Sequence, residues 1–259
     1  MRTRFIVGNW KMHKTASEAK VFIGQLAQAI PPLGNLQIGL APPFTALQAV
    51  REALGSSPQF LLGAQNLHWE DKGAFTGEVS GAMLADLDCR FVLIGHSERR
   101  QYFGESDGWI NKKVLAALRH GIMPILCVGE TLQERDSGQT DAIIQRQLRA
   151  ALNGVEDSAV ASLTIAYEPV WAIGTGHAAS PDQAAPVHRL IRRTLNDLSR
   201  SNAGERVRVL YGGSVTSDNI AEFLASEEID GGLVGGACLD PVRFATLLTV
   251  ALGYKSTAN

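Results

Sequence analysis

Polar residues that can do acid–base chemistry stand where short apolar runs of the sequence end. Glu168 closes one such run and is followed at once by Pro169. A carboxylate that is partly removed from water in this way has a raised pKa, which makes it a stronger base. Glu168 alone does not decide between this interpretation and a structural carboxylate paired with an arginine.

His96 and Lys11 also follow apolar runs. His96 precedes the polar residues 97–100, which could begin a short helix. The positive end of a helix disfavours a second proton on the ring, and a neutral histidine can still donate a hydrogen bond to a substrate oxygen. Lys11 follows Asn9, and its cation would favour an anionic substrate and a developing oxyanion. A hydrogen-bonded core histidine and a surface lysine are the simpler alternatives.

Two glycine clusters, at 211–214 and 231–236, close the last two apolar runs. Glycine lets backbone N–H groups approach an anion closely, and the loops after the last two strands of an α/β barrel often bind phosphate. Tight turns at a crowded barrel end would explain the same glycines. Residues 174–179 formally match a dinucleotide-binding motif, but they follow the end of a strand at the wrong distance, and we reject it.

The elements that would position these residues alternate regularly along the chain. Eight apolar runs without strict alternation are typical of strands covered on both faces. Helical patterns separate them, so the sequence predicts parallel βαβ units and favours a closed barrel over an open sheet. We expect one α/β domain, a (β/α)8 TIM barrel over residues 1–259, with a frayed tail at 254–259. The predicted strands are 5–11, 37–42, 60–66, 91–97, 123–130, 163–169, 207–214 and 231–237.

The carboxyl ends of parallel barrel strands meet at one rim, where active sites of such barrels form. A purely structural barrel would have no need to gather many polar groups there. The predicted rim residues are Asn9, Lys11, Gln65, Asn66, His96, Glu98, Glu130, Glu168, Ser214, Gly235 and Gly236.

Two connections are longer than usual, which often indicates function. Residues 65–80 carry Trp69 and Phe75, apolar side chains that a monomer would have to expose or fold back, so we expect an oligomer. Residues 169–176 have proline at one end and Gly174 and Gly176 at the other. We interpret this stretch as a lid over Glu168.

Composition excludes other classes of protein. The chain has 24 Lys and Arg against 26 Asp and Glu, which gives no indication of nucleic acid or membrane binding. The basic residues of 189–208 are interpreted as a solvated helix face. Three widely spaced cysteines and the absence of a signal-peptide pattern favour buried thiols and a cytoplasmic location.

Taken together, these residues resemble the triosephosphate isomerase family. The matching motifs fall in the same order along nearly the whole chain: GNWKM (8–12), GAQN (63–66), GAFTGEVS (73–80), IGHSERR (94–100), CVGE (127–130), AYEPVWAIGTG (166–176), YGGSV (211–215) and GGLVGGA (231–237).

The resemblance implies interconversion of dihydroxyacetone phosphate and D-glyceraldehyde 3-phosphate without cofactor or metal. It implies that Glu168 is the base, that His96 is the neutral electrophile, and that Lys11 and Asn9 support the enediolate. Glu98 resembles the family's carboxylate beside that lysine and histidine. The phosphate donors implied are Gly174, Ser214, Gly235 and Gly236.

The resemblance also implies a homodimer or tetramer in which loop 65–80 enters the neighbouring subunit, with Thr76 near its Asn9 and Lys11. Three positions depart from the family pattern: Gly81, where proline is common, Cys238, where serine is common, and Asp240. A non-catalytic sugar-phosphate binder, or another phosphosugar isomerase or epimerase, stays open as an alternative.

Overall fold

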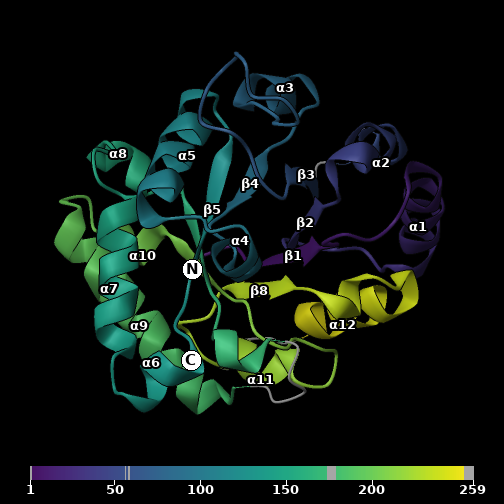
Figure 1. Cartoon of the computed structure of the whole chain (residues 1–259). Coiled ribbons are helices and arrows are strands. Elements are labelled where there is room, and N and C mark those ends of the chain that lie inside the picture. The colour runs from purple at the N-terminus through teal and green to yellow at the C-terminus, as the bar shows by residue number, and fades with distance from the viewer. Residues whose placement is uncertain (1, 56, 58, 174–178, 254–259) are drawn as a thin grey trace.

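The described residues form eight strands that close into a parallel barrel (Figure 1). The computed structural model describes residues 2–253 except 56, 58 and 174–178. Each strand pairs with its neighbour in the sequence, and β8 pairs with β1. The strands are β1 (Phe5–Asn9), β2 (Gln37–Ala41), β3 (Phe60–Ala64), β4 (Phe91–Ile94), β5 (Met123–Val128), β6 (Thr164–Tyr167), β7 (Arg208–Tyr211) and β8 (Gly231–Val234).

The predicted TIM barrel is thereby confirmed, but every strand ends one to three residues earlier than predicted. Strand β6, for example, ends at Tyr167 rather than at 169. The polar rim residues continue each apolar run in the sequence, but only Asn9, the last residue of β1, belongs to a strand. The other candidate functional residues lie on the loops and short helices that follow the strands.

Helices surround the barrel, and the first and last of the chain, α1 and α12, lie side by side (Figure 1). Six of the helices in the described part of the chain have only four to six residues: α3, α4, α6, α8, α10 and α11. The helices are α1 (Ala16–Ala29), α2 (Leu47–Leu54), α3 (Gly81–Asp86), α4 (Ser97–Tyr102), α5 (Asp107–Arg119), α6 (Leu132–Asp136), α7 (Thr140–Ala151), α8 (Asp157–Val160), α9 (Pro181–Leu198), α10 (Ala203–Arg206), α11 (Ile220–Leu224) and α12 (Pro241–Gly253).

Side-chain caps fix where the longer helices begin. Ser180 accepts from the backbone N–H of Gln183, whose side chain accepts from Ser180 N, so a capping box begins α9. Asp240, one of the departures from the family pattern, accepts from the N–H groups of Val242 and Arg243 at 3.0 and 2.8 Å and so caps α12. Such a cap contributes about 1 kcal/mol to helix stability.

The core has two layers, because the strands are buried on both faces. One cluster fills the barrel and includes Phe5, Phe91 and Leu210; the other lies between the strands and the helices. Gly63 has no side chain because the ring of Phe91 occupies that space: an added Cβ would lie 2.3 Å from it. None of the helices built by the described residues is long and apolar enough to cross a membrane.

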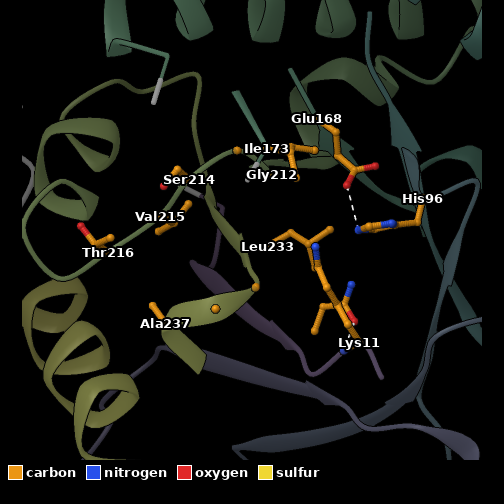
Figure 2. A pocket seen from close by; sticks show the side chains of 14 residues that line it. Lys11, His96, Glu168, Ile173, Gly212, Ser214, Val215, Thr216, Leu233 and Ala237 are labelled. Carbon is orange, nitrogen blue, oxygen red and sulfur yellow. Dashed lines mark hydrogen bonds and ion pairs between the residues drawn. The ribbon is translucent and has the colours of Figure 1, made fainter. Parts of the chain in front are cut away.

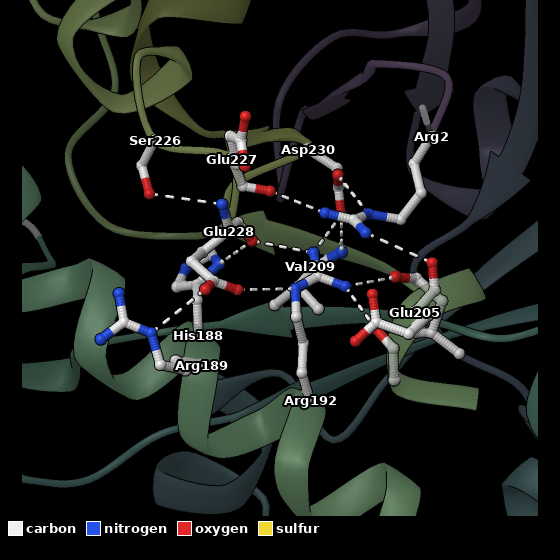
Figure 3. A network of polar contacts seen from close by, with 12 residues as sticks. Arg2, His188, Arg189, Arg192, Glu205, Val209, Ser226, Glu227, Glu228 and Asp230 are labelled. Atoms are coloured by element: carbon white, nitrogen blue, oxygen red, sulfur yellow. Dashed lines mark hydrogen bonds and ion pairs between the residues drawn. The ribbon is translucent and has the colours of Figure 1, made fainter. Parts of the chain in front are cut away.

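A network of charged groups joins α9 to the amino-terminal end of the barrel, opposite the rim (Figure 3). Arg192 is 5% exposed and places Nη2 2.6 Å from Oδ2 of Asp230. Asp230 also accepts from the backbone of Val209 and from the side chain of Arg2. The predicted solvated face is therefore wrong for Arg192. The charge pattern of a helix in the sequence does not show that one long side chain, here that of Arg192, reaches a carboxylate at the amino-terminal end of the barrel.

Candidate active site

Most of the predicted site residues meet at one cavity of about 280 Å³ at the carboxyl ends of the strands (Figure 2). Gly174, and with it the predicted lid beyond Ile173, lies outside the described residues. Glu98 borders a second cavity of about 190 Å³ that shares Asn9, Lys11 and His96 with the first. The first cavity is lined by Asn9, Lys11, His96, Glu168, Ile173, Gly212, Gly213, Ser214, Val215, Thr216, Leu233, Gly235, Gly236 and Ala237.

Glu168 is 2% exposed, and its carboxylate is held by two neighbouring residues. Oε2 accepts from the backbone N–H of Ser97 at 2.9 Å, and Oε1 lies 3.0 Å from Nε2 of His96 (Figure 2). The main chain of Glu168 donates to the carbonyl of Val128 at 2.8 Å, so this position is tied to the end of β5. The described contacts of the carboxylate are thus with His96 and Ser97 rather than with an arginine.

His96 caps the amino terminus of α4, as the polar sequence after it predicted. Its Nδ1 accepts from the backbone N–H of Glu98 at 3.3 Å, so that nitrogen carries a lone pair. The hydrogen of the ring then lies on Nε2, the nitrogen that faces Glu168, a tautomer assigned from the hydrogen bonds. This is the arrangement of a neutral imidazole that donates toward the cavity.

Lys11 has a φ of 51°, a left-handed conformation that is unusual for a residue other than glycine. Its N–H donates to Oδ1 of Asn9 at 3.0 Å, and its carbonyl accepts from Nε2 of Gln65 at 2.8 Å. Its Nζ lies 2.6 Å from Oε1 of Glu98. Hydrogen bonds to its backbone and an ion pair with its side chain therefore hold Lys11 in this conformation. A strained backbone conformation persists only where the surrounding structure fixes it in this way.

The two glycine clusters form the other wall of the cavity. Among the contacts of the described residues, the N–H groups of Ser214, Gly235 and Gly236 have no acceptor, so they are available to an anion. A Cβ added to Gly236 would meet nothing within 4 Å, and one added to Gly235 would lie 3.9 Å from Nζ of Lys11. Backbone donors and a cation therefore face the same space, which suits a phosphate group.

Two predicted rim residues lie behind the cavity rather than in it. Glu130 is fully buried and accepts from Oη of Tyr167 and Nε1 of Trp171 at 3.1 and 2.9 Å. Asn66 accepts from Nζ of Lys113 at 2.7 Å. Both hold the loops around the site together.

Ser97 is a site residue that the sequence pattern did not predict, and it provides two contacts to Glu168. Its place directly after His96, at the expected start of a helix, was the available signal. A thiol also lies behind the carboxylate: burial, and then the charge of Glu168, raise the pKa of Cys127 well above its usual value.

Cys238 packs beneath this end of the barrel. Its Sγ lies 3.2 Å from the carbonyl oxygen of Val234 and 3.5 Å from that of Asn9. A thiol therefore replaces the family's common hydroxyl between two backbone acceptors, and burial raises its pKa to about 12.

The sequence of the chain is similar to those of known proteins along nearly its whole length. The sequence model of a family described as triosephosphate isomerase matches residues 4–251. A triosephosphate isomerase of Chloroflexus aurantiacus is 51% identical over 248 residues, 96% of this chain and 99% of the relative. Those of Moorella thermoacetica and Symbiobacterium thermophilum are 51% and 49% identical, over 96% and 97% of this chain and 98% of each relative.

Proposed function

The chain belongs to the triosephosphate isomerase family, and on this premise we propose that Glu168, His96 and Lys11 carry out its reaction. The reaction is the reversible interconversion of dihydroxyacetone phosphate and D-glyceraldehyde 3-phosphate, a step of glycolysis and gluconeogenesis. One observation carries the assignment of residues: a buried carboxylate, a ring N–H and an ammonium group meet at one cavity. Neither the relatives nor the cavity favours a non-catalytic binder or an epimerase.

Glu168 moves a proton between the two carbons. It removes a proton from the hydroxyl-bearing carbon next to the substrate carbonyl and returns it to the carbonyl carbon, while the hydroxyl proton of the first carbon passes to the former carbonyl oxygen. Negative charge develops on the carbonyl oxygen in between, where Nε2–H of His96 donates a hydrogen bond. Nε2 of His96 and Oε1 of Glu168 lie 3.0 Å apart, so base and donor are close enough to act on neighbouring atoms of one small substrate that takes over this hydrogen bond.

Lys11 and Asn9 supply the remaining electrostatic support for the enediolate, and Glu98 positions the lysine through their 2.6 Å contact. Loss of one good oxyanion donor typically raises a reaction barrier by about 2.7–4 kcal/mol. The N–H groups of Ser214, Gly235 and Gly236 would hold the substrate phosphate.

We expect Glu168→Asp to lower kcat by about a hundredfold or more, because the shorter side chain moves the carboxylate by roughly 1 Å. KM should change much less, since the phosphate donors stay in place. A coupled assay of triose phosphate interconversion on the purified protein measures both constants, and Glu168→Gln should have almost no activity.

Glu156→Asp is the matched control, because Glu156 is exposed just before α8, at the opposite end of β6. It should leave kcat and KM unchanged. A Glu168→Asp enzyme as fast as the original protein would refute the assignment of the base.

We also propose a homodimer formed through loop 65–80. Large apolar side chains are exposed around the second cavity: Met12 is 94% exposed and Phe103 64%, and both line it. Phe75, at the tip of the loop, is 43% exposed. Insertion of this loop into the second cavity of another copy would cover these groups and bring Thr76 beside the Asn9 and Lys11 of that copy.

A cytoplasmic location is the third part of the proposal. The triose phosphates are intermediates of central metabolism, and the three cysteines are free and buried. Free thiols of this kind are typical of a reducing compartment.

A further inference from the structure

Gln147, on the buried face of α7, makes a pair of hydrogen bonds with a single residue of the loop after β5. Its side chain is nearly inaccessible to solvent, with the residue 4% exposed. Oε1 accepts from the N–H of Gly129 at 2.8 Å, and Nε2 donates to the carbonyl of Gly129 at 3.0 Å. The amide therefore saturates both backbone groups of Gly129, as a neighbouring strand would.

Gly129 in turn lies against the main chain of Glu168. A Cβ added to Gly129 would lie 1.7 Å from the carbonyl oxygen of Glu168 and 2.6 Å from its carbonyl carbon. The residues on either side of Gly129 accept from the same segment: Glu168 N–H donates to Val128 at 2.8 Å, and Val170 N–H donates to Glu130 at 3.1 Å. The backbone that carries the base thus rests on residues 128–130.

We infer that Gln147 is a positioning residue for the base Glu168, acting through the backbone of Gly129. The inference rests on the proposed role of Glu168 as the base. Without the amide, the two polar groups of Gly129 would be buried without partners. The loop would have to move to reach other partners, and the contact with Glu168 would carry that movement to the carboxylate.

The first test is Gln147→Leu, which removes both hydrogen bonds at similar volume. We expect kcat of the folded enzyme to fall about tenfold or more, with KM within about twofold of the original value, because the base is displaced while the phosphate donors are not. Gln145→Leu, two positions earlier on α7 and partly exposed, is the matched control and should leave kcat unchanged.

The second test is Gln147→Glu. The kcat of this variant should depend on pH in a way that a structural role alone would not produce. A protonated carboxylic acid can both accept from Gly129 N–H and donate to its carbonyl, whereas the carboxylate can only accept. Burial raises the pKa of a carboxyl group, so protonation should be reached in mildly acidic solution. Relative to the original enzyme, kcat of Gln147→Glu should approach parity at about pH 6 and fall toward that of Gln147→Leu at about pH 8.5.

The outcomes separate this role from the proposed function. If Glu168→Asp is slow but Gln147→Leu keeps full kcat, the role of Gln147 is refuted and the base stands. If Glu168→Asp is fast, both are refuted. If Gln147→Leu does not fold, the pH profile of Gln147→Glu decides: a constant ratio to the original enzyme across this range refutes the inference.

Discussion

The carboxylate of Glu168 is held by His96, the group that we propose as the donor to the substrate carbonyl. Nε2 of His96 carries one hydrogen and lies 3.0 Å from Oε1 of Glu168. A substrate carbonyl that accepts from this N–H competes with Glu168 for it, so substrate binding itself would release the carboxylate toward the carbon-bound proton. The two donors of Ser97 would then remain: its backbone N–H, 2.9 Å from Oε2, and its Oγ, 3.4 Å from Oε1.

His188 makes the stability of the protein depend on pH. The residue is fully buried on α9, and burial lowers the pKa of its ring to about 3, from an ordinary value of 6.5. The unfolded chain therefore binds a proton below about pH 6.5 that the folded protein does not. We expect the unfolding free energy to be highest above that pH and to decrease as pH falls from 6.5 toward 3.

His188→Asn should make this decrease shallower, because an amide does not titrate and can still donate to the carbonyl of Glu228, which lies 3.3 Å from Nδ1. Urea unfolding of both proteins at several pH values measures the two slopes. Equal slopes would show that His188 does not contribute to the acid sensitivity.

Residue types at strand ends were enough to predict which side chains meet, but not how they are oriented. Asn9, Lys11, His96 and Glu168 line one cavity because a parallel barrel brings all carboxyl strand ends to one rim. The contact of Glu168 with Ser97 depends on a backbone N–H at the first turn of α4. No side-chain type encodes such a contact; only the place of Ser97 at the expected start of a helix indicates that its N–H is free for another acceptor.

At the scale of the elements, the strands and long helices were predictable because burial and capping leave patterns in the sequence. Helices α6, α8 and α10, with at most five residues each, were not predicted. They are too short to show a helical repeat of apolar residues. Strand ends were predicted too late because apolar and glycine residues continue past the last ladder hydrogen bond.

Gly81, at the start of α3, gives room to a contact that holds the proposed interface loop. A Cβ at this position would lie 2.4 Å from Cδ2 of His120, so the family's common proline and this ring position exclude each other. Nε2 of His120 lies 2.8 Å from Oδ1 of Asp71, in loop 65–80. Glycine at position 81 therefore leaves room for the hydrogen bond by which His120 holds loop 65–80 in place.

We expect Gly81→Ala to destabilise the protein when His120 is present, because the ring must leave Asp71. In a His120→Ala background the same change should be neutral or stabilising by up to about 1 kcal/mol, since alanine favours a helix over glycine. Urea unfolding of the original protein, the two single variants and the double variant, all at the same protein concentration, completes this double-mutant cycle. The same effect in both backgrounds would contradict the steric link.

At the scale of the whole molecule, the exposed apolar groups around the second cavity predict that activity depends on association. Light scattering at micromolar concentration should give the mass of a dimer. Phe75→Asp, which places a charge at the tip of the loop, should shift the mass toward the monomer and lower activity in dilute solution. Val21→Asp is the control, because Val21 is also exposed, at 59%, and lies on α1. A fully active protein with the mass of a monomer would refute the dimer.

The pairing of β8 with β1 gives the molecule a circular order of contacts. Nη1 of Arg4, the residue before β1, also donates to the carbonyl of Ala251 at 3.1 Å, so the start of the first strand is tied to the last helix. The contacts of the barrel therefore do not require that β1 be the first strand in the order of the chain. A circular permutant, with the old ends linked and new ends opened at the exposed residues 153–154, would keep every strand neighbour and rebuild the same active site from a different starting residue.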